Sequence, residues 1–211
     1  MRLVILVLAV AGSAGLCAFQ ETQPGDALPP DHPPVSPLPP GHPPVIPSAP
    51  GQAPVATVPA EAADVGSVQA VVDAYYDSIS GPVGAPRDWD RFRSLSLPEA
   101  RLMTLVAAAG GDAPLVLGPE QFMRMNRRYF ESGGYSEQSI HEQLDEFSRV
   151  AHVWSTYEAR RGDDAGPYSR GVTSFQLLHS GGRWWIVNVV WDRERRGLTL
   201  PPEYLPQPKS P

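Results

Sequence analysis

The stretch that decides the fold is SGGRWWIVNVVWD, residues 180–192. The paired glycines at 181 and 182 accept the positive φ angles of a tight hairpin turn. The run after them is rich in Trp, Ile and Val, which is typical of a strand, and we expect that strand over residues 184–192. The turn requires a partner strand upstream, and residues 168–179 have the composition to form it. The stretch therefore predicts an antiparallel hairpin near the end of the chain.

The last expected strand indicates that both faces of the sheet are covered. With regular alternation, one face carries Trp184, Ile186, Asn188 and Val190, and the other carries Trp185, Val187, Val189 and Trp191. A strand with one face in water would alternate apolar with polar residues. We expect helices on one face. The other face is covered by a second subunit or by the chain ends, or it exposes its aromatic residues; of these, we favour a homodimer.

The register of the hairpin predicts where two polar side chains point. A two-residue turn at 181–182 places Asn188 opposite Phe175 and Gln176 opposite Val187. Because residues opposite each other share a face, Asn188 and Gln176 should point to opposite faces. We therefore expect that they do not line one pocket together, and that each needs its own hydrogen-bond partner if it is buried.

Upstream of this hairpin, the sequence predicts helices and further strands from the spacing of its apolar residues. The expected helices cover 65–80, with Asp64 or Ser67 as the cap, 87–95, and a segment that starts at Pro119 and ends at Gly133-Gly134. The additional strands cover 100–108, 141–147 and 150–161. This order of elements predicts an α+β fold in which three N-terminal helices pack on one face of a curved antiparallel sheet.

Two N-terminal segments precede this domain. Arg2, an apolar run and a group of small residues predict a signal peptide over 1–18, cleaved after Ala18; lipidation of Cys17 and an uncleaved anchor are the alternatives. Residues 19–60 predict a disordered, proline-rich tether in which residues 38–47 repeat residues 28–37. The domain then spans 61–205, and 206–211 form a disordered tail. The protein should be exported, to a periplasm, a cell envelope or the medium, and should meet a membrane only through an uncleaved or lipidated leader.

The composition excludes several classes of function. The formal net charge is −6, and the arginines of the domain are interleaved with acidic residues, so nucleic-acid binding is not expected. Cys17 is the single cysteine and falls in the leader, so the domain has neither a disulfide nor thiol chemistry. No Cys/His spacing typical of a metal site is present. We therefore expect no metal and no cofactor.

Several local sequences, in this order of elements, resemble the nuclear transport factor 2-like superfamily. The matching segments are VVDAYY (71–76), RDWD (87–90), HVWSTYE (152–158), RGVTSFQL (170–177) and GRWWIV (182–187). The resemblance covers about residues 65–195 and is to an uncharacterised, exported bacterial branch with a polyketide-cyclase/ketosteroid-isomerase-like fold. It implies a cone-shaped fold, a pocket between sheet and helices, and frequent dimers. Because the superfamily holds both enzymes and binding modules, it implies no single activity.

Six residues are candidates for ligand binding: Tyr75, Trp89, His152, Trp154, Glu158 and Asn188. Tyr75 lies on the helix face that should look into the pocket, and the resemblance implies a match to a tyrosine that donates to an oxyanion in ketosteroid isomerase. A packed core tyrosine is the alternative. His152, Trp154 and Glu158 share a strand face, but His152 and Glu158 are about 20 Å apart along the strand. Each should therefore make its own hydrogen bond rather than form a dyad.

Three functions remain open after these observations. The first is an exported pocket domain that binds a small apolar ligand or a protein partner, which the supply of aromatic residues favours. The second is an enzyme of the isomerase, dehydratase or cyclase type that uses Tyr75, although no carboxylate matches the isomerase base. The third is a structural assembly module of the cell envelope that uses the second apolar face of the sheet.

Overall fold

The computed structural model describes residues 58–109, 111–162 and 166–207. The predictions for the leader, for Cys17, and for nearly all of the tether and the tail lie outside these residues. In the described ranges, no helix has the length and apolar character needed to cross a membrane.

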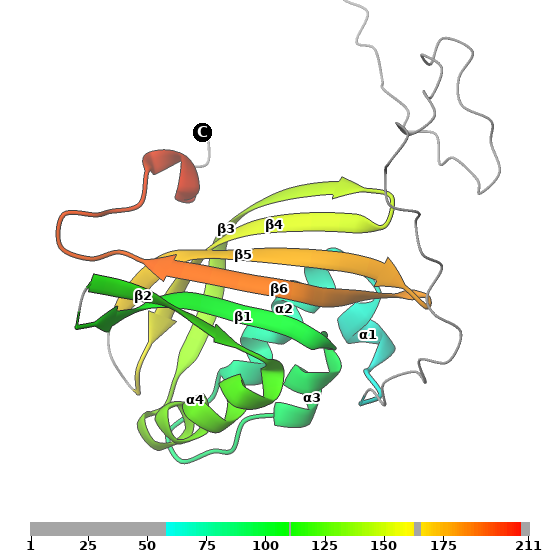
Figure 1. The fold of residues 1–211 in the computed structure, drawn as a ribbon, viewed down its shortest axis with the longest axis horizontal. Helices are drawn as coiled ribbons and strands as arrows, with labels where there is room; N and C mark the ends of the chain where they lie inside the picture. Colours follow the sequence, from blue (N-terminus) through cyan, green and yellow to red (C-terminus); the bar gives the residue numbers. More distant parts are fainter. Residues whose placement is uncertain (1–57, 110, 163–165, 208–211) are drawn as a thin grey trace, which may run out of the picture. The chain divides into compact units, whose positions relative to one another are not determined.

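Three of the helices form where the apolar spacing predicts them, and one short helix, α1, was not predicted. They are α1 (Ala62–Val65), α2 (Val68–Ile79), α3 (Trp89–Ser94) and α4 (Pro119–Gly133). The Ser67 hydroxyl accepts a hydrogen bond from the Ala70 N–H at 3.2 Å, which caps α2 as expected. Pro119 opens α4, where its missing N–H has no helical partner to lose. All four helices lie on one side of the sheet (Figure 1).

The strands form a single curved, six-stranded sheet in the order β2-β1-β6-β5-β4-β3. Their bounds are β1 (Ser96–Ala108), β2 (Gly111–Leu117), β3 (Ser136–Phe147), β4 (Val150–Arg160), β5 (Ser169–Ser180) and β6 (Arg183–Arg193). A short helix, η1 (Pro202–Tyr204), follows β6 on the side of the sheet away from the other helices (Figure 1). The fold is therefore α+β, as expected.

The sheet is mixed rather than purely antiparallel. Four of its five strand pairings are antiparallel, but β1 pairs with β6 in parallel. Hairpin signals define only neighbours along the chain, and β1 and β6 are far apart in sequence, so the expectation of an antiparallel sheet was wrong at this pair. The edge strand β2 was also missed. It contains Pro114, which an edge strand tolerates because one side of it has no partner.

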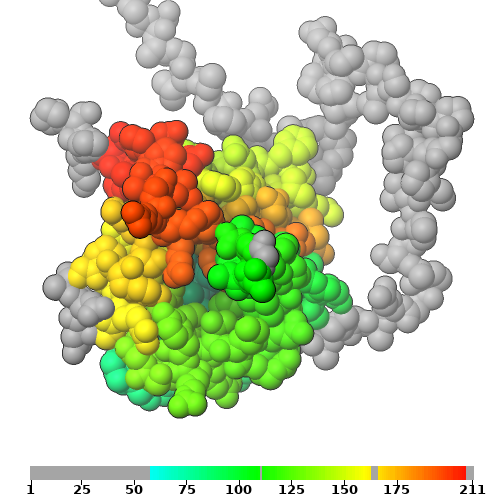
Figure 2. All heavy atoms as spheres, turned by 60° about the vertical axis from the view of Figure 1, so that its left-hand side comes forward, coloured from blue at the N-terminus to red at the C-terminus, as the bar shows by residue number. Residues whose placement is uncertain are grey.

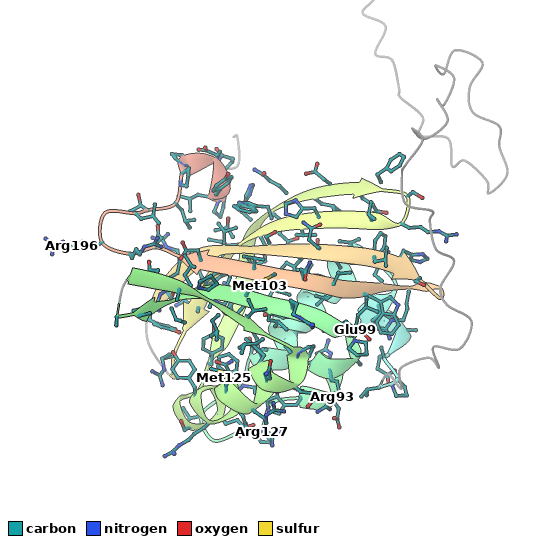
Figure 3. The ribbon with its side chains drawn as sticks, viewed as in Figure 1. Arg93, Glu99, Met103, Met125, Arg127 and Arg196 are labelled. Carbon is teal, nitrogen blue, oxygen red and sulfur yellow. The ribbon has the colours of Figure 1, made fainter. Side chains whose placement is uncertain are left out.

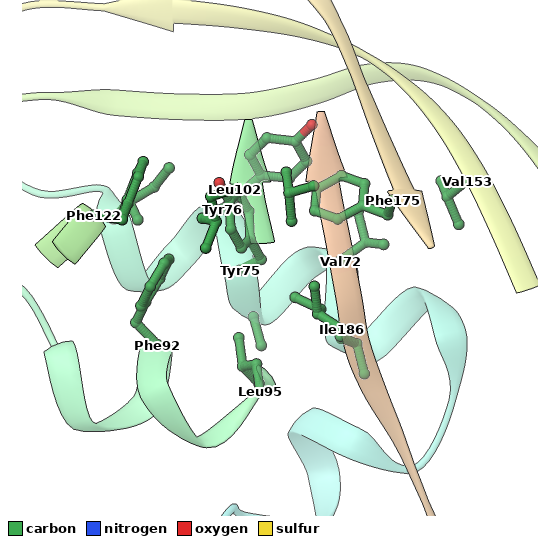
Figure 4. Close-up of a cluster of buried hydrophobic side chains, with 14 of the residues drawn as sticks. Val72, Tyr75, Tyr76, Phe92, Leu95, Leu102, Phe122, Val153, Phe175 and Ile186 are labelled. Carbon is green, nitrogen blue, oxygen red and sulfur yellow. The ribbon is translucent and has the colours of Figure 1, made fainter. Parts of the chain in front are cut away.

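The core lies between the helices and the sheet. Figure 4 shows its centre, where Tyr75 and Tyr76 of α2 meet Phe92 of α3 and Phe175 of β5. The Tyr75 ring lies edge-on to Phe175, with the ring centroids 5.1 Å apart, a favoured aromatic geometry. The Tyr76 hydroxyl donates to the Ser155 hydroxyl at 2.8 Å, so it is satisfied although it is buried.

A buried arginine fastens the loop between α2 and α3. The Arg87 side chain donates to the carbonyl oxygens of Ile79 at 3.0 Å, Gly81 at 2.7 Å, Ala85 at 2.7 Å and Phe130 at 2.6 Å. Arg87 is 5% exposed. Its charge is therefore solvated by backbone dipoles instead of water, which joins α2 and α4 through one side chain.

A bulge in β6 changes which side chains face the core. Leu177 pairs with Ile186, but the next pair is Gln176 with Asn188, so Val187 is an extra residue in β6. Beyond the bulge the alternation is inverted, and Val189 points to the helices together with Trp184 and Ile186. Trp191 also joins the core, with its ring 6.0 Å from that of Phe122. The faces expected from regular alternation were therefore wrong after residue 187.

Within the described ranges, the other face of the sheet, called the open face below, carries no helix of the size of α2 or α4. Trp185 and Val190 of β6 lie on it, and the Arg183 guanidinium covers the Trp185 ring at 3.6 Å. The segment after β6 covers one end of this face. Coverage by a chain end was one of the three alternatives that the sequence left open. The expected homodimer stays a prediction, and light scattering of the purified protein tests it.

Candidate functional site

An interior cavity of about 130 Å³ lies between the helices and the helix-facing side of the sheet. Its lining residues come from α2, α4, the start of β3, the loop before β5, and β5 and β6: Tyr75, Ile79, Phe122, Asn126, Tyr129, Phe130, Tyr135, Glu137, Tyr168, Thr173 and Trp191. Figure 2 shows the molecule hollowed between its green, yellow and orange parts, with blue-green atoms of the early helices at the floor of the hollow. The cavity is therefore walled mainly by aromatic rings and opens at one end of the sheet.

Glu137 is the one acidic side chain in this lining. Its carboxyl group is enclosed by the cavity walls, and this burial raises the pKa of Glu137 to about 7; the hydrogen bond donated by the Tyr135 hydroxyl opposes the rise. The backbone N–H of Glu137 donates to the Ser80 hydroxyl at 2.9 Å, which ties the start of β3 to the end of α2. Glu137 is thus held in place and can change protonation near neutral pH.

Tyr75 presents its hydroxyl to the same cavity. Tyr75 is 5% exposed, and its ring packs against Tyr76, Phe92 and Phe175. Burial, and then the negative charge of Glu137, raise the pKa of Tyr75 well above its ordinary value. The hydroxyl therefore stays protonated, and no hydrogen bond occupies it among the residues that the structure describes. It remains available as a donor to a ligand oxygen.

The cavity combines a neutral donor with a carboxyl group poised between its two protonation states. An engineered apolar cavity of about 150 Å³ holds benzene, so 130 Å³ suits a single small ring. The aromatic walls favour an apolar body, whereas Tyr75 and Glu137 favour an oxygen on it. The cavity therefore contains a carboxyl group, Glu137, which was not among the sequence candidates and lies outside the expected strand 141–147.

Trp89, the second candidate from the sequence, belongs to the wall behind the cavity and does not line it. Its indole N–H donates to a Glu131 carboxylate oxygen at 3.1 Å, and its ring stacks on Phe130 with centroids 6.2 Å apart. Trp89 is 6% exposed. These contacts account for its packing, and they join α3 to α4.

The remaining four candidates lie on the open face, so the structure does not bring them to Tyr75. His152 and Ser174 are 3.0 Å apart between the ring Nε2 and the hydroxyl. Glu158 lies 3.7 Å from Arg160 and 4.0 Å from Arg170. As expected, His152 and Glu158 have separate partners and form no dyad.

Asn188 corrects the predicted register. It pairs with Gln176 across β5 and β6, not with Phe175, because the bulge at Val187 inserts one residue. Both amides therefore lie on the open face, contrary to the expectation of opposite faces. Asn188 is half-buried and Gln176 is exposed, so water can form the hydrogen bonds that these two amide groups do not form within the protein.

Trp154 lines a larger groove on the open face. The groove has a volume of about 530 Å³ and runs between the sheet and the C-terminal segment 194–204. The Trp154 ring lies 5.7 Å from the Tyr204 ring, and its buried indole nitrogen has no hydrogen-bond partner among the described residues. The groove and the interior cavity thus lie on opposite faces of the sheet, with Trp191 in the lining of both. Over the described part of the chain, no group of three or more His, Cys, Asp or Glu side chains could hold a metal ion.

Sequence reasoning missed Glu137 and its neighbours Tyr135 and Tyr168. A glutamate in an edge strand is usually solvated, and nothing local distinguishes one that is enclosed by aromatic rings contributed by distant segments. The one available signal was the Gly133-Gly134 stop after α4, because it places Tyr135 and Glu137 at the start of a new element.

Comparison with known proteins gave results for structure alone. No family model matches the chain, and a search of curated proteins found no match. Among solved structures, an NTF2-like protein of unknown function from Shewanella baltica OS155 is 10% identical, covering 58% of this chain and 85% of its own, with a TM-score of 0.40.

Two further solved structures show a similar level of likeness. A protein of unknown function from Mycobacterium tuberculosis is 14% identical, with coverage of 61% and 70% and a TM-score of 0.47. An NTF2-like protein of unknown function from Methylobacillus flagellatus KT is 18% identical, with coverage of 61% and 95% and a TM-score of 0.41. These solved structures are similar to this chain, and the similarity defines no reaction or ligand.

Proposed function

We propose that the domain binds a small, mostly apolar molecule that carries one oxygen, in the interior cavity. The observation that carries this proposal is the free Tyr75 hydroxyl beside the enclosed Glu137 carboxyl in a cavity otherwise lined largely by aromatic rings. The Tyr75 hydroxyl forms no hydrogen bond with any described residue and belongs to a residue of the cavity lining, so it can donate to a ligand oxygen, a bond that contributes about 0.5–1.5 kcal/mol net. The apolar body of the ligand replaces water against the rings.

Phenol, cyclohexanol and benzene are suitable probes, because all three are single rings and two carry a hydroxyl. We expect phenol and cyclohexanol to raise the melting temperature of the purified protein more than benzene at the same concentration. Tyr75→Phe and Glu137→Gln should remove this difference while benzene keeps its effect. Tyr204→Phe, which changes a tyrosine on the other face of the sheet, is the matched control. Equal shifts for all three probes, or no shift, would contradict the proposal.

A second candidate function is proton transfer, of the kind that isomerases, dehydratases and cyclases use. One specific observation favours it: burial raises the pKa of Glu137 to about 7, where a carboxylate is an effective base near neutral pH. In this scheme ionised Glu137 takes a proton from the carbon next to a ketone. The Tyr75 hydroxyl donates a hydrogen bond to the resulting enolate oxygen, and Glu137 returns a proton to the same carbon.

Deuterium exchange of cyclopentanone in heavy water, followed by NMR, tests this reaction. We expect the protein to accelerate exchange with a rate that rises through a pKa near 7, and Glu137→Gln to abolish the acceleration. An acceleration that survives in Glu137→Gln, or none in the wild type, counts against proton transfer. Ligand binding without exchange would leave the binding proposal standing alone.

Export and tethering also remain proposals. The pattern of residues 1–18 and the proline-rich residues 19–60 support them. Fractionation of cells that produce the full chain, with mass spectrometry of its N-terminus, tests cleavage after Ala18 against lipidation of Cys17. An unprocessed chain in the cytoplasmic fraction would exclude both.

A further inference from the structure

The outer face of α4 carries three arginines around one hollow of about 410 Å³. The residues that line this hollow are Arg124, Arg127, Arg128, Gly84, Glu131 and Ser132. Arg127 and Arg128 follow Arg124 by three and four positions, so the three side chains are neighbours on the helix surface. All three are exposed, and Figure 3 shows Arg127 on the side of α4 away from the sheet. The hollow is thus open to solvent and surrounded by positive charge.

The acidic residues of α4 are bound to other groups. Both carboxylate oxygens of Glu120 accept from the Arg93 guanidinium, one of them at 3.3 Å. One carboxylate oxygen of Glu131 accepts from the Trp89 indole N–H at 3.1 Å and from the Arg87 backbone N–H at 3.4 Å. Within the described ranges, no ion pair joins the three arginines of the hollow to an acidic side chain. The charges that alternate along the sequence therefore do not pair with these arginines in the fold.

The hollow has a local excess of positive charge. Three guanidinium groups and one carboxylate line it, and the buried Arg87, whose backbone N–H is bound to Glu131, adds a further cation behind it. Because exposed charges are screened beyond about 8 Å at physiological salt, a ligand at this surface interacts with the arginines more than with the net charge of −6 on the whole chain. The hollow therefore complements an anion.

Two exposed apolar side chains adjoin the arginines. Met125 is 58% exposed and lies three positions before Arg128, which makes the two side chains neighbours on the helix. Val83 is 59% exposed and precedes Gly84, which lines the hollow. At a membrane surface, apolar side chains enter the boundary of the acyl chains while basic side chains contact the anionic headgroups. A soluble anion would use the arginines alone, so this combination favours a membrane.

We propose that the outer face of α4 docks on an anionic phospholipid membrane, with a lipid phosphate in the hollow between the three arginines and with Met125 and Val83 in the interface. A guanidinium group is planar and can donate to two phosphate oxygens at once. The Arg127 guanidinium lies over the Trp89 ring, 6.0 Å from its centroid, a contact that orders the side chain without using its N–H donors. The hollow shares no lining residue with the interior cavity, so the proposal does not depend on the function proposed for that cavity.

Co-sedimentation of the full chain with vesicles tests the proposal. The vesicles contain phosphatidylcholine alone or an equal mixture of phosphatidylcholine and phosphatidylglycerol. We expect stronger binding to the mixed vesicles, and a loss of about 25-fold in Arg124→Gln/Arg128→Gln, which is about fivefold for each arginine. Arg149→Gln/Arg196→Gln is the matched control and should bind as the wild type does, because both residues are exposed in turns outside α4 (Figure 3 shows Arg196). Residues 1–57 are the same in every variant, so binding through them cannot produce a difference between variants.

Met125→Gln tests the apolar part of the surface. We expect it to weaken binding to the mixed vesicles about three- to tenfold, because less apolar area leaves water. Leu144→Gln, at a residue of β3 that is 49% exposed, is the control and should have no effect. Since all of these side chains are on the surface, none of the substitutions should unfold the protein.

Two sets of results would overturn the proposal. The first is equal binding to both kinds of vesicle, or equal losses in the two double variants. The second is tighter binding of inorganic phosphate or of single-stranded DNA than of the mixed vesicles, lost in Arg124→Gln/Arg128→Gln, which would assign the hollow to that ligand instead of a membrane. Tyr75→Phe should leave vesicle binding unchanged, so failure here is distinguishable from failure of the interior site.

Discussion

Glu137→Gln should change how the stability of the protein depends on pH. Burial raises the pKa of Glu137 from its ordinary value of 4.5 to about 7. The folded protein therefore holds a proton that the unfolded chain releases between about pH 4.5 and 7. The stability of the wild type is greatest below pH 4.5 with respect to this group, falls as pH rises to 7, and is constant above that.

The size of this loss follows from the same pKa values. One pKa unit corresponds to 1.36 kcal/mol, so the rise in the pKa of Glu137 lowers the free energy of unfolding at high pH by about 3 kcal/mol in total. Most of this loss falls between pH 5 and pH 8. Glutamine keeps an oxygen that accepts from the Tyr135 hydroxyl but has no proton to lose. The free energy of unfolding of Glu137→Gln should therefore rise relative to the wild type by about 2–3 kcal/mol from pH 5 to pH 8.

Urea unfolding at pH 5, 6, 7 and 8 measures this difference directly. The comparison with the wild type at each pH cancels the other titrating groups, which the two proteins share. Glu99→Gln is the control for the substitution itself, because Glu99 is exposed on β1, away from the cavity (Figure 3). A difference between Glu137→Gln and the wild type that is the same at pH 5 and pH 8 would refute the reasoning about the cavity.

Three further substitutions test the contacts that hold the cavity walls. Tyr76→Phe removes the buried donor to Ser155 and should lower the free energy of unfolding by about 1–2 kcal/mol in urea. Arg87→Lys replaces a side chain that reaches four carbonyl oxygens with one that has a single nitrogen; we expect a loss of about 3 kcal/mol or more, seen as a lower melting temperature. Gly171→Ala places a methyl group against the Asp192 carbonyl oxygen of β6, and should cost about 2 kcal/mol or prevent soluble folding.

Each of these has a matched control of the same chemistry. Tyr204→Phe removes a hydroxyl that has no hydrogen bond within the described residues and should cost little. Arg127→Lys changes an arginine on the outer face of α4 (Figure 3). Gly166→Ala adds a methyl group where no atom lies within 4 Å. If a control is as destabilising as its test variant, the specific contact is not the cause.

Much of the secondary structure could be predicted from local patterns. The stripe of apolar residues over 65–80 gave the position of α2, because helical spacing is a property of neighbouring residues. The paired glycines gave the last hairpin, and both have positive φ, 63° and 77°. Tyr75 could be placed in the interior for the same reason. These features depend on residues close together in the chain, which the sequence displays directly.

Two features of the sheet depended on distant partners. The parallel pairing of β1 with β6 joins segments nearly a whole domain apart, and no turn signal connects them. The bulge at Val187 depends on how β6 packs against β5 and the helices, and it alone moved Asn188 to the side of Gln176. A one-residue shift reverses every later side chain, so the faces of β6 could not be read from alternation.

The sequence by itself determined the class of the fold, the main helices and the hairpin strands, because spacing and turn chemistry are local. Only the tertiary structure decided that Glu137 lines the interior cavity, that its pKa approaches 7, and that an apolar groove lies on the open face. Burial and electrostatic environment are set by side chains brought together from several elements. They therefore exist only once the chain has folded.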